Sequence, residues 1–321
     1  MSGRSRRGAG APANRVEVTA HAKLNLGLRV GPLRPDGFHD LVTVFQSVSL
    51  ADTLVAERAR SGFALHIRHE ESAIRGGQGR AARAAVPVGA ANLVVRAARL
   101  AKERLGLPGG ARFTLVKRIP AQAGMGGGSA DAAAALAAML ALHGLRLPRR
   151  RRIELAAELG SDVPFAITGG TALGLGRGER LVPLRLATPM RAVVAVPDWR
   201  VPTADAFGRL DEAKYGLTGW KRTLRFASSL GRKRVTAFQS LRLGNDFDKV
   251  LGHRRHDFEV LRAGLRRAGL LEPHLTGSGS GIFGMVPKGV SVRAIAGRFA
   301  GREPLYRVRS KGKGLRIARR S

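Results

Sequence analysis

Apolar and polar residues alternate strictly from Val16 to Arg29, which is the first clear pattern in the chain. A period of two is typical of a β-strand with one buried face. We therefore predict a strand here, whose apolar face consists of Val16, Val18, Ala20, Ala22, Leu24, Leu26 and Leu28. Lys23 and Asn25 then share its polar face, and taken alone each is most simply interpreted as an ordinary solvent-facing residue.

Further apolar runs predict the other elements. Branched and aromatic residues favour a strand that begins at Leu41 and a continuation of it at 52–55. The same residue types predict further strands at 63–67, 112–116 and 192–196. Helices are predicted from Asn92 to about Leu105, from Ala130 to Leu142, and over a segment that ends at Gly160. Segments 58–89 and 214–239 carry no interpretable pattern, although the first contains the strand at 63–67.

A glycine-rich loop follows the strand at 112–116, and the alanine-rich helix follows the loop. The loop begins with Lys117 and reads Ile-Pro-Ala-Gln-Ala-Gly-Met-Gly-Gly-Gly-Ser from Ile119 to Ser129. We expect Ser129 to cap the helix and Asp131 to supply an acid in its first turn. Glycines let backbone N–H groups converge on an anion at a helix N-terminus, so the loop is predicted to bind phosphate. It lacks the residues of a Walker A loop and of a Rossmann fingerprint, and a plain turn before a core helix is the simpler alternative for a glycine triplet alone.

The loop closely resembles the phosphate loop of the small-molecule kinases that include galactokinase, homoserine kinase and mevalonate kinase, known as the GHMP kinases. A second block narrows this resemblance: Ala-Lys-Leu-Asn-Leu at 22–26 precedes Asp-Gly-Phe-His at 36–39 and Phe-Gln-Ser at 45–47. It resembles the start of the 4-diphosphocytidyl-2-C-methyl-D-erythritol kinase family, which usually has tyrosine in place of Phe38. Two more blocks match that family. The first consists of Gly-Ser-Asp-Val-Pro-Phe at 160–165 and Gly-Gly-Thr-Ala-Leu-Gly at 169–174. The second consists of residues 201–207 and the glycine-rich segment 275–281.

The resemblance implies an α+β fold with the two-domain GHMP-kinase architecture. An N-terminal ATP-binding domain at 16–187 would be like domain 2 of ribosomal protein S5, and a C-terminal domain at 188–310 would be ferredoxin-like. Residues 1–15 are expected to be a disordered basic tail and 311–321 a second basic tail. The implied reaction transfers the γ-phosphoryl group of ATP to the 2-hydroxyl of the methylerythritol unit, in the non-mevalonate isoprenoid pathway.

The resemblance also assigns site residues. Asp162 would be the base for the accepting hydroxyl, and Lys23 would orient that hydroxyl and stabilise negative charge. ATP would be held by Pro120, Ala121, Gln122, Ala123, Gly124, Met125, Gly126, Gly127, Gly128, Ser129 and Ala130, with Asn92 near the base and Lys117 at the start of the loop. Substrate would contact Asn25, Phe38, His39, Thr203 and Phe207, with the two phenylalanines on either side of cytosine. Mg²⁺ is expected with ATP; its protein ligand is not identified, and Ser129 is a candidate.

Simpler structural roles stay open for several of these residues. Asn92 and Asp162 both stand where an N-cap is expected, and a cap needs no ligand to explain it. Gly277, Ser278 and Gly279 lie either in a hairpin turn or, as the resemblance implies, in a second glycine loop that packs near the first.

Composition limits the other classes of function. The net charge of +33 would attract nucleic acid or anionic membranes without specificity. Aromatic residues make up only 5% of the chain, so stacking platforms for nucleic acid are scarce, and the arginines are spread along the chain. We therefore expect solvated surface arginines, no specific nucleic acid and no membrane partner, and a monomer or homodimer that binds ATP and a small anionic substrate.

The absence of cysteine excludes disulfides and thiolate chemistry and fits a reducing cytoplasm. The longest apolar run, Ala132 to Leu142, is too short to cross a bilayer, and no secretory signal is visible. Two alternatives remain: another kinase of the superfamily, acting on homoserine or mevalonate, and a basic nucleic-acid-binding protein of S5-like fold. Filter binding at two salt concentrations distinguishes the second, because phosphate-backbone binding is lost at high salt.

Overall fold

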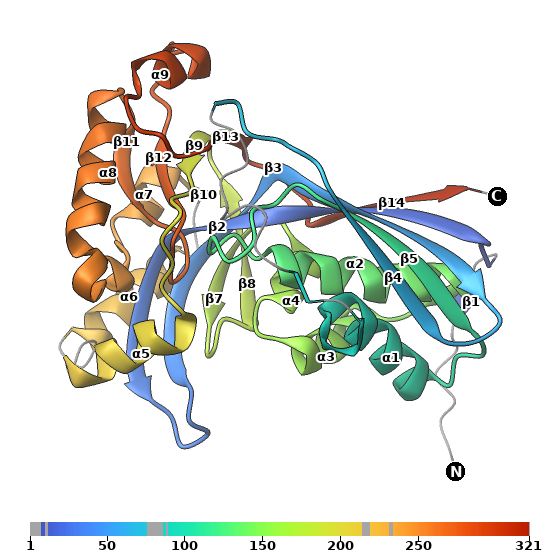
Figure 1. Ribbon diagram of the computed structural model, residues 1–321. Coiled ribbons are helices and arrows are strands. Elements are labelled where there is room, and N and C mark those ends of the chain that lie inside the picture. The colour runs from blue at the N-terminus through green and yellow to red at the C-terminus, as the bar shows by residue number, and fades with distance from the viewer. Residues whose placement is uncertain are drawn as a thin grey trace.

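A computed structural model of the chain describes residues 8–9, 12–75, 86–87, 89–213, 219–230 and 234–320. It consists of two α+β units, each built on its own sheet (Figure 1). The α+β class predicted from the sequence is confirmed.

The larger sheet has, in the described part of the chain, eight strands with β10, β8, β7, β3, β2 and β14 hydrogen-bonded in that order; β5 joins β3, and β4 joins β5. Its two longest members, β2 and β3, pair antiparallel along most of their length. The bounds are β2 (Arg15–Leu33), β3 (His39–Ala59), β4 (Phe63–His69), β5 (Gly110–Lys117), β7 (Thr171–Leu175), β8 (Arg180–Leu186), β10 (Arg234–Val235) and β14 (Leu315–Arg320). The alternating apolar residues from Val16 onward lie in β2, as their period of two predicts.

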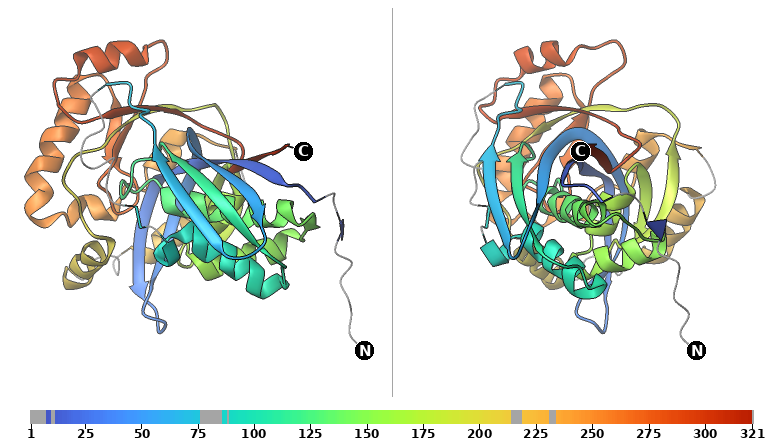
Figure 2. Two further views of the ribbon diagram at one scale, coloured as in Figure 1. Left: turned by 45° about the vertical axis from the view of Figure 1, so that its right-hand side comes forward. Right: turned by 90° about the vertical axis from the view of Figure 1, so that its right-hand side faces the viewer.

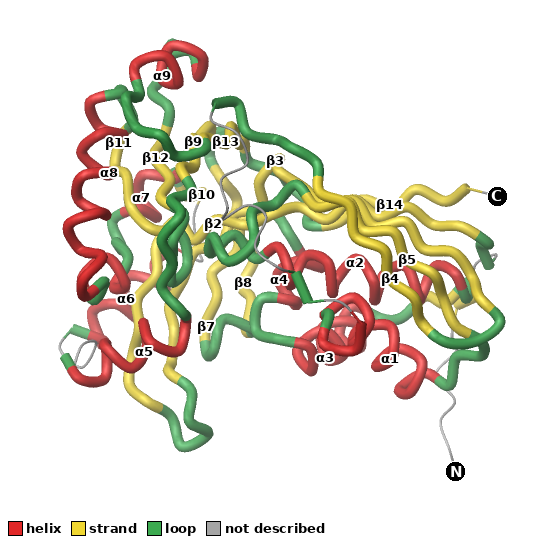
Figure 3. Tube along the Cα trace, viewed as in Figure 1, coloured by secondary structure: helices red, strands yellow, loops and turns green. Residues whose placement is uncertain are grey.

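Helices cover one side of this sheet, and the strands curve around them (Figures 2 and 3). The central one, α2 (Gly127–Leu142), is buried on nearly all sides between α1, α4, β2 and β3. Its many alanines explain this position, because they favour helix and their small side chains allow close approach on every face. The others are α1 (Leu93–Leu105), α3 (Arg149–Leu159) and α4 (Val163–Thr168), with a 3₁₀ turn η1 at Gly89–Ala91.

The second unit follows the order β-α-β-β-α-β that defines the ferredoxin-like motif. Its antiparallel sheet has the order β11–β12–β9–β13. Its strands are β9 (Arg191–Ala195), β11 (Leu271–Leu275), β12 (Ile282–Met285) and β13 (Leu305–Arg309), and its helices include α5 (Thr203–Glu212), α8 (Arg255–Arg267) and α9 (Val292–Arg298), with 3₁₀ turns η2 (Asp246–Lys249) and η3 (Gly252–Arg254). The ferredoxin-like prediction is therefore confirmed.

The run Ala192–Val196 is continuously apolar because both faces of the second sheet are buried. Ala192 and Val194 belong to the core of the first unit, whereas Val193 and Ala195 belong to the core of the second. A strand that is covered on both sides needs no polar alternation. The second sheet is thus packed directly against the first unit.

Three boundaries differ from the sequence-based prediction. The expected basic tail at 311–321 contains β14, which pairs antiparallel with β2, because alternating Leu315 and Ile317 can extend the open edge of the sheet. Helices α6 (Trp220–Leu230) and α7 (Ala237–Leu241) fall inside the expected C-terminal domain, yet they contribute side chains to the core of the first unit. Helix α2 begins at Gly127 with Gly126 in the left-handed N-cap position, so Ser129 is not the cap.

The predicted N-terminal tail lies largely outside the described residues. Within the described part, β1 (Gly8–Ala9) pairs with β6 (Leu145–Arg146), and the carbonyl of Asn14 accepts a hydrogen bond from the N–H of Arg58. Among the described residues before Val16, Gly8, Ala9 and Asn14 are therefore hydrogen-bonded to the rest of the chain.

Candidate active site

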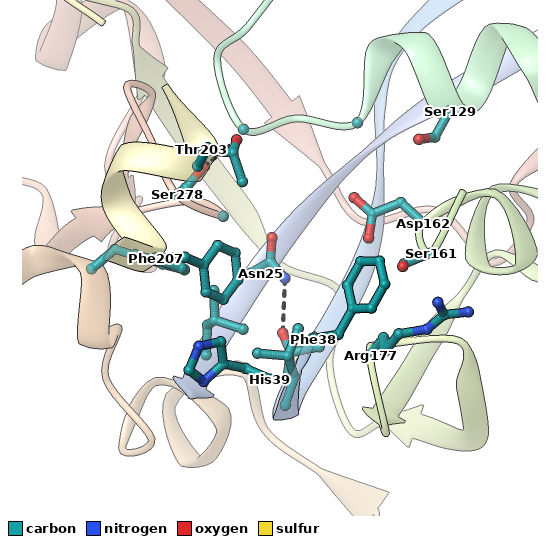
Figure 4. Close-up of a pocket in the computed structure, with 18 of the residues that line it drawn as sticks. Asn25, Phe38, His39, Ser129, Ser161, Asp162, Arg177, Thr203, Phe207 and Ser278 are labelled. Carbon is teal, nitrogen blue, oxygen red and sulfur yellow. Dashed lines mark hydrogen bonds between the residues drawn. The ribbon is translucent and has the colours of Figure 1, made fainter. Parts of the chain in front are cut away.

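A cavity of about 840 Å³ opens between the two units. Strands β2 and β3 form its floor, and the glycine-rich loops lie above it. Helix α5 closes one side, and Ser161 and Asp162 at the start of α4 lie on the other (Figure 4). Predicted site residues that line it are Lys23, Asn25, Phe38, His39, Gly124, Gly126, Ser129, Asp162, Thr203, Phe207, Gly277 and Ser278. Residues from four separate sequence blocks therefore meet in one cavity.

The floor carries Lys23 and Asn25, which are buried rather than solvent-facing. The Lys23 ammonium donates to Asn25 Oδ1, and Asn25 Nδ2 donates to Thr43 Oγ1 at 2.8 Å. The register of β2 against β3 shifts on both sides of this pair, between His21 and Lys23 and between Asn25 and Gly27. Such irregularities re-aim side chains, and they occur often beside active sites.

Asp162 stands directly ahead of α4, yet its side chain makes no capping hydrogen bond. Instead its Oδ2 lies 3.4 Å from Lys23 Nζ, and its side chain is 32% exposed toward the cavity. The capping interpretation therefore does not explain Asp162. The ion pair does, and it joins two residues that are far apart in the sequence.

The first glycine loop is held against the floor by its backbone. The carbonyl of Met125 accepts from the N–H of Lys23 at 3.0 Å, and Gly124 and Gly126 both have φ near +70°. A Cβ on Gly126 would lie 3.0 Å from Lys23 Cγ. Glycine therefore lets the loop and the N-terminus of α2 sit directly over the lysine.

The second glycine-rich segment packs on the first, as the kinase resemblance implies, and it also joins the paired strands β11 and β12. Thr276 Oγ1 donates to the carbonyl of Gly124 at 3.3 Å and accepts from the N–H of Asn25 at 3.1 Å. A Cβ on Gly124 would lie 1.9 Å from the carbonyl oxygen of Thr276. The two loops and the floor thus form one tightly packed layer.

Comparison with known proteins places this geometry in a family. Residues 92–170 match the family model for the GHMP kinases N terminal domain. The chain is 37% identical to a 4-diphosphocytidyl-2-C-methyl-D-erythritol kinase of Solibacter usitatus, with 91% of this chain and 88% of that protein covered. It is 43% identical to the kinase of the same description from Salinispora tropica, with coverages of 85% and 83%.

The chain belongs to the 4-diphosphocytidyl-2-C-methyl-D-erythritol kinase family. A crystal structure of a 4-(cytidine 5'-diphospho)-2C-methyl-D-erythritol kinase superposes with a TM-score of 0.68 at 35% identity, covering 92% of this chain and all of that one. A homoserine kinase from Cytophaga hutchinsonii shares the fold, with a TM-score of 0.65 at 18% identity over 99% of this chain. The GHMP-kinase architecture predicted from the sequence is therefore confirmed.

Two aromatic side chains line the cavity of this family member from opposite sides (Figure 4). Phe207 stacks on His39 with ring centroids 5.4 Å apart and meets Phe247 edge-on at 5.0 Å. Phe38, at the turn between β2 and β3, is 50% exposed, and the Arg177 guanidinium lies 4.7 Å from its ring centroid. A planar group could enter between these two phenylalanines.

Lys117 has a different position from the one expected of an ATP ligand. Its ammonium lies 2.5 Å from Asp52 Oδ2 and 2.6 Å from Asp131 Oδ2, and all three side chains are buried. Although burial lowers the pKa of Lys117, the carboxylates of Asp131 and Asp52 raise it above its usual value. Burial raises the pKa of Asp131 to about 8, against the opposing effect of the Lys117 charge.

This ion cluster ties together both ends of the first glycine loop. Asp52 Oδ1 accepts from the backbone N–H groups of Arg118 and Ile119, at 2.6 and 2.9 Å. Asp131 is the fifth residue of α2, beyond its first turn, so it is not the first-turn acid that the sequence predicted. Lys117 is therefore better described as a residue that supports the loop than as one that lines the cavity.

The remaining predicted ATP residues contribute in other ways. Asn92 caps α1 by accepting from the N–H of Val94 at 2.8 Å, and its amide donates to the carbonyl of Pro87, so its local contacts are those of a cap. Ala123, Met125 and Ala130 are buried behind the loop. Gln122, with Gly279, lines a neighbouring cavity of about 400 Å³. Pro120, Ala121, Gly127 and Gly128 complete the loop but do not line the larger cavity.

Sequence reasoning missed several residues that line the cavity, among them Thr43, Arg177 and Asp211. Thr43 accepts a hydrogen bond from Asn25 because β3 lies beside β2, and no local pattern reveals that pairing. Arg177 lies within the glycine-rich 176–178 and would have been suggested only by its place beside a matched block. Asp211 follows Phe207 by four residues on α5, and that helix was not predicted.

None of the helices in the described ranges is long and apolar enough to span a membrane.

Proposed function

We propose that this chain phosphorylates 4-diphosphocytidyl-2-C-methyl-D-erythritol on its 2-hydroxyl with ATP, giving the 2-phosphate and ADP in the non-mevalonate isoprenoid pathway. One observation carries the proposal: the Lys23–Asp162 pair lies in a single cavity between a glycine loop and an aromatic-lined recess. The loop suits a triphosphate, the recess suits a pyrimidine, and the pair lies where a hydroxyl of the substrate would meet the phosphate.

Asp162 is the base in this mechanism. The hydroxyl oxygen forms a bond to the γ-phosphorus, the bond from that phosphorus to the β,γ-bridging oxygen breaks, and its electron pair leaves with ADP. The hydroxyl proton passes to the Asp162 carboxylate, which is partly exposed to the cavity. Phosphoryl transfer needs mainly positioning and charge stabilisation, so a weak base that is correctly placed is sufficient.

Lys23 positions the reacting groups and stabilises negative charge. Its ammonium contacts both Asp162 and Asn25, and its side chain is buried under Gly126. A buried cation interacts more strongly with developing charge than an exposed one, because less water screens it. Lys23 is therefore suited to hold the hydroxyl and the transferred phosphoryl group together.

The triphosphate would bind at the N-terminus of α2. The first backbone N–H groups of a helix have no partner within the helix, and the helix dipole favours an anion there. Gly126 and Ser129, at this end of α2, line the cavity. The loop supported by Lys117, Asp52 and Asp131 would keep these donors in place.

Mg²⁺ fits this site as an ion that enters with ATP. Among the described residues no group of three or more His, Cys, Asp or Glu side chains could hold a metal alone. Mg²⁺ commonly uses one or two protein groups together with substrate phosphates and water, and the Ser129 hydroxyl lines the cavity at the start of α2. Ser129 would hold the ion, whose charge would offset that of the β- and γ-phosphates.

Cytosine would lie between Phe38 and Phe207, near His39, while Asn25 and Thr203 would contact the rest of the substrate. Thr203 Oγ1 lies 3.0 Å from Ser278 Oγ, so it joins α5 to the second glycine loop. The recess separates this proposal from phosphorylation of homoserine or mevalonate, which have no base to stack.

A coupled assay of ADP release tests the proposal. The enzyme should turn over 4-diphosphocytidyl-2-C-methyl-D-erythritol with Mg²⁺ and ATP, and homoserine and mevalonate should give only background rates. Equal or faster turnover of either of those alternatives would refute the proposal. Turnover that persists at salt concentrations high enough to remove phosphate-backbone binding would separate the enzyme from a nucleic-acid-binding protein.

A further inference from the structure

The C-terminal end of the chain contacts both elements that carry the Lys23–Asp162 pair. Gly314 immediately precedes β14, the strand that lies beside β2 (Figure 1). Its carbonyl accepts a hydrogen bond from the N–H of His21 at 2.9 Å, and His21 lies two residues before Lys23 on β2. Gly314 also abuts α4, the short helix that Asp162 precedes.

The contact between Gly314 and α4 leaves no room for a side chain. A Cβ on Gly314 would lie 2.0 Å from the carbonyl oxygen of Ala166, and a Cβ on Gly169 would lie 1.7 Å from the backbone nitrogen of Gly314. Ala166 is one turn beyond Asp162, and its N–H donates to the Asp162 carbonyl at 3.0 Å. Since α4 has only six residues, a displacement at Ala166 would reach Asp162 through a single hydrogen-bonded turn.

The segment before Gly314 is hydrogen-bonded to the floor of the cavity. The N–H of Lys311 donates to the carbonyl of Ser47 at 2.8 Å, and Gln46 Nε2 donates to the carbonyl of Lys311 at 3.0 Å. Ser47 and Gln46 belong to β3, and after Gly314 the chain continues into the antiparallel pairing of β14 with β2. Gly314 is therefore fixed to both floor strands, and α4 packs against it.

We propose that Gly314 is a positioning residue for the phosphoryl transfer, which sets the separation of Lys23 and Asp162 by keeping β2 and α4 at a fixed distance. This inference rests on the proposed function. Gly314 is buried and does not line the larger cavity, so it acts through Asp162 and not on a substrate. A side chain at this position would displace α4 relative to the floor, and Asp162 relative to Lys23, because the segment that carries it is bonded to both floor strands.

The test compares Gly314→Ala with Gly312→Ala in the ADP-release assay. Neither glycine has a φ in the left-handed region, and among the described residues nothing lies within 4 Å of a Cβ on the exposed Gly312, so only the first substitution creates a clash. The added methyl group and Ala166 must separate by about 1 Å, and a misplacement of about that size can cost about 10²-fold in rate. We expect Gly314→Ala to lower kcat by about 10- to 100-fold with both KM values little changed, whereas Gly312→Ala keeps the kcat of the unaltered enzyme.

A double variant separates positioning from a general loss of structure. In Asp162→Asn the base is already lost, so the addition of Gly314→Ala should lower kcat by less than about twofold if Gly314 acts through Asp162. A general structural defect would lower kcat by the same factor in both backgrounds. The inference is overturned by equal losses in both backgrounds, by an unchanged kcat in Gly314→Ala, or by the same loss in Gly312→Ala.

Amide hydrogen exchange of the unaltered protein gives a second test, which applies even if Gly314→Ala does not fold. The N–H of His21, bonded to Gly314, and the N–H of Ala166 in α4 should have similar opening free energies, because segments that open cooperatively exchange as one unit. Exchange of Ala166 through a separate opening of much lower free energy would show that α4 moves independently of Gly314 and overturns the inference. The measurement needs no substrate, so it still reports on Gly314 in an enzyme that fails to phosphorylate the cytidine substrate, an outcome that contradicts the proposed function instead.

Discussion

Lys23 Nζ and Asp162 Oδ2 lie 3.4 Å apart, although one residue is in a long strand and the other precedes a short helix. Asp162 makes no capping hydrogen bond, and Lys23 is buried beneath the first glycine loop. The pair therefore has no evident purpose in the local structure of either element. Its position between the loop and the aromatic recess is the basis of the catalytic role proposed above, which several substitutions can test.

Asp162→Asn separates chemistry from local structure. Asparagine is nearly isosteric, and Asp162 makes no capping hydrogen bond that could be lost, so the melting temperature should change little. The amide cannot take a proton from the hydroxyl, and a positioned base typically contributes about 10²- to 10⁴-fold in rate. We expect kcat to fall within that range in the ADP-release assay, with both KM values little changed. Full activity in a folded variant would show that Asp162 is not the base.

Lys23→Met removes the ammonium but keeps most of the apolar stem. The kcat should fall, because the developing charge loses a buried partner. Kinetics of the double variant Lys23→Met with Asp162→Asn would show whether the residues act as a unit. If they serve one hydroxyl together, the double variant should be no worse than about the poorer single variant. Losses that multiply would indicate independent roles.

Gly124→Ala tests the contact between the two glycine loops. Gly124 has a φ of +69°, and a Cβ there would lie 1.9 Å from the carbonyl oxygen of Thr276, so the loops must separate. We expect a loss of more than about 1 kcal/mol of unfolding free energy and a raised KM for ATP. Gly297→Ala is the control: this helical glycine has no neighbour within 4 Å of the added carbon and should be neutral or slightly stabilising. Identical unfolding and kinetics of Gly124→Ala and the unaltered enzyme would contradict the described packing.

Phe38→Ala tests the aromatic recess. Stacking of a base on an aromatic ring is worth about 1–3 kcal/mol, so the KM for the cytidine substrate should rise by about 5- to 150-fold while the KM for ATP stays the same. The melting temperature should hardly move, because Phe38 is half exposed. Phe38→Tyr restores the usual residue of the family and should behave like the unaltered enzyme. Equal effects of Phe38→Ala on both substrates would place the base elsewhere.

Asp131→Asn tests the ion cluster through the pH dependence of stability. Burial raises the pKa of the Asp131 carboxyl from 3.8 to about 8 in the folded protein. Because this pKa is higher in the folded than in the unfolded protein, protonated Asp131 contributes to the free energy of unfolding. That contribution is fully present below about pH 4 and is lost as the pH rises from about 4 through about 8. Denaturant unfolding at several pH values should show this loss for the unaltered protein and a flatter profile for Asp131→Asn. Parallel profiles would show that Asp131 is ionised throughout.

Local chemistry predicted most of the elements and the residue types of the site. The alternation from Val16 predicted β2, and the alanine run predicted α2, because these patterns reflect which faces are buried. Which segment pairs with the open edge of a sheet is not determined by the local sequence of either strand. The segment from Leu315 therefore resembled a basic tail in the sequence, although it pairs with the open edge of β2 as strand β14.

The sequence by itself determined which groups the site could use: a phosphate loop, a lysine, an aspartate and aromatic residues, each within a short specific block. Only the tertiary structure decided their roles, because burial and partners depend on segments far apart in the chain. Lys23 and Asn25 are on the polar side of an alternating strand, yet the second unit and the glycine loops cover them. Lys117 begins the phosphate loop in the sequence, yet its ammonium is buried and forms ion pairs with Asp52 and Asp131. These pairs are needed because a buried charge is costly unless it is paired.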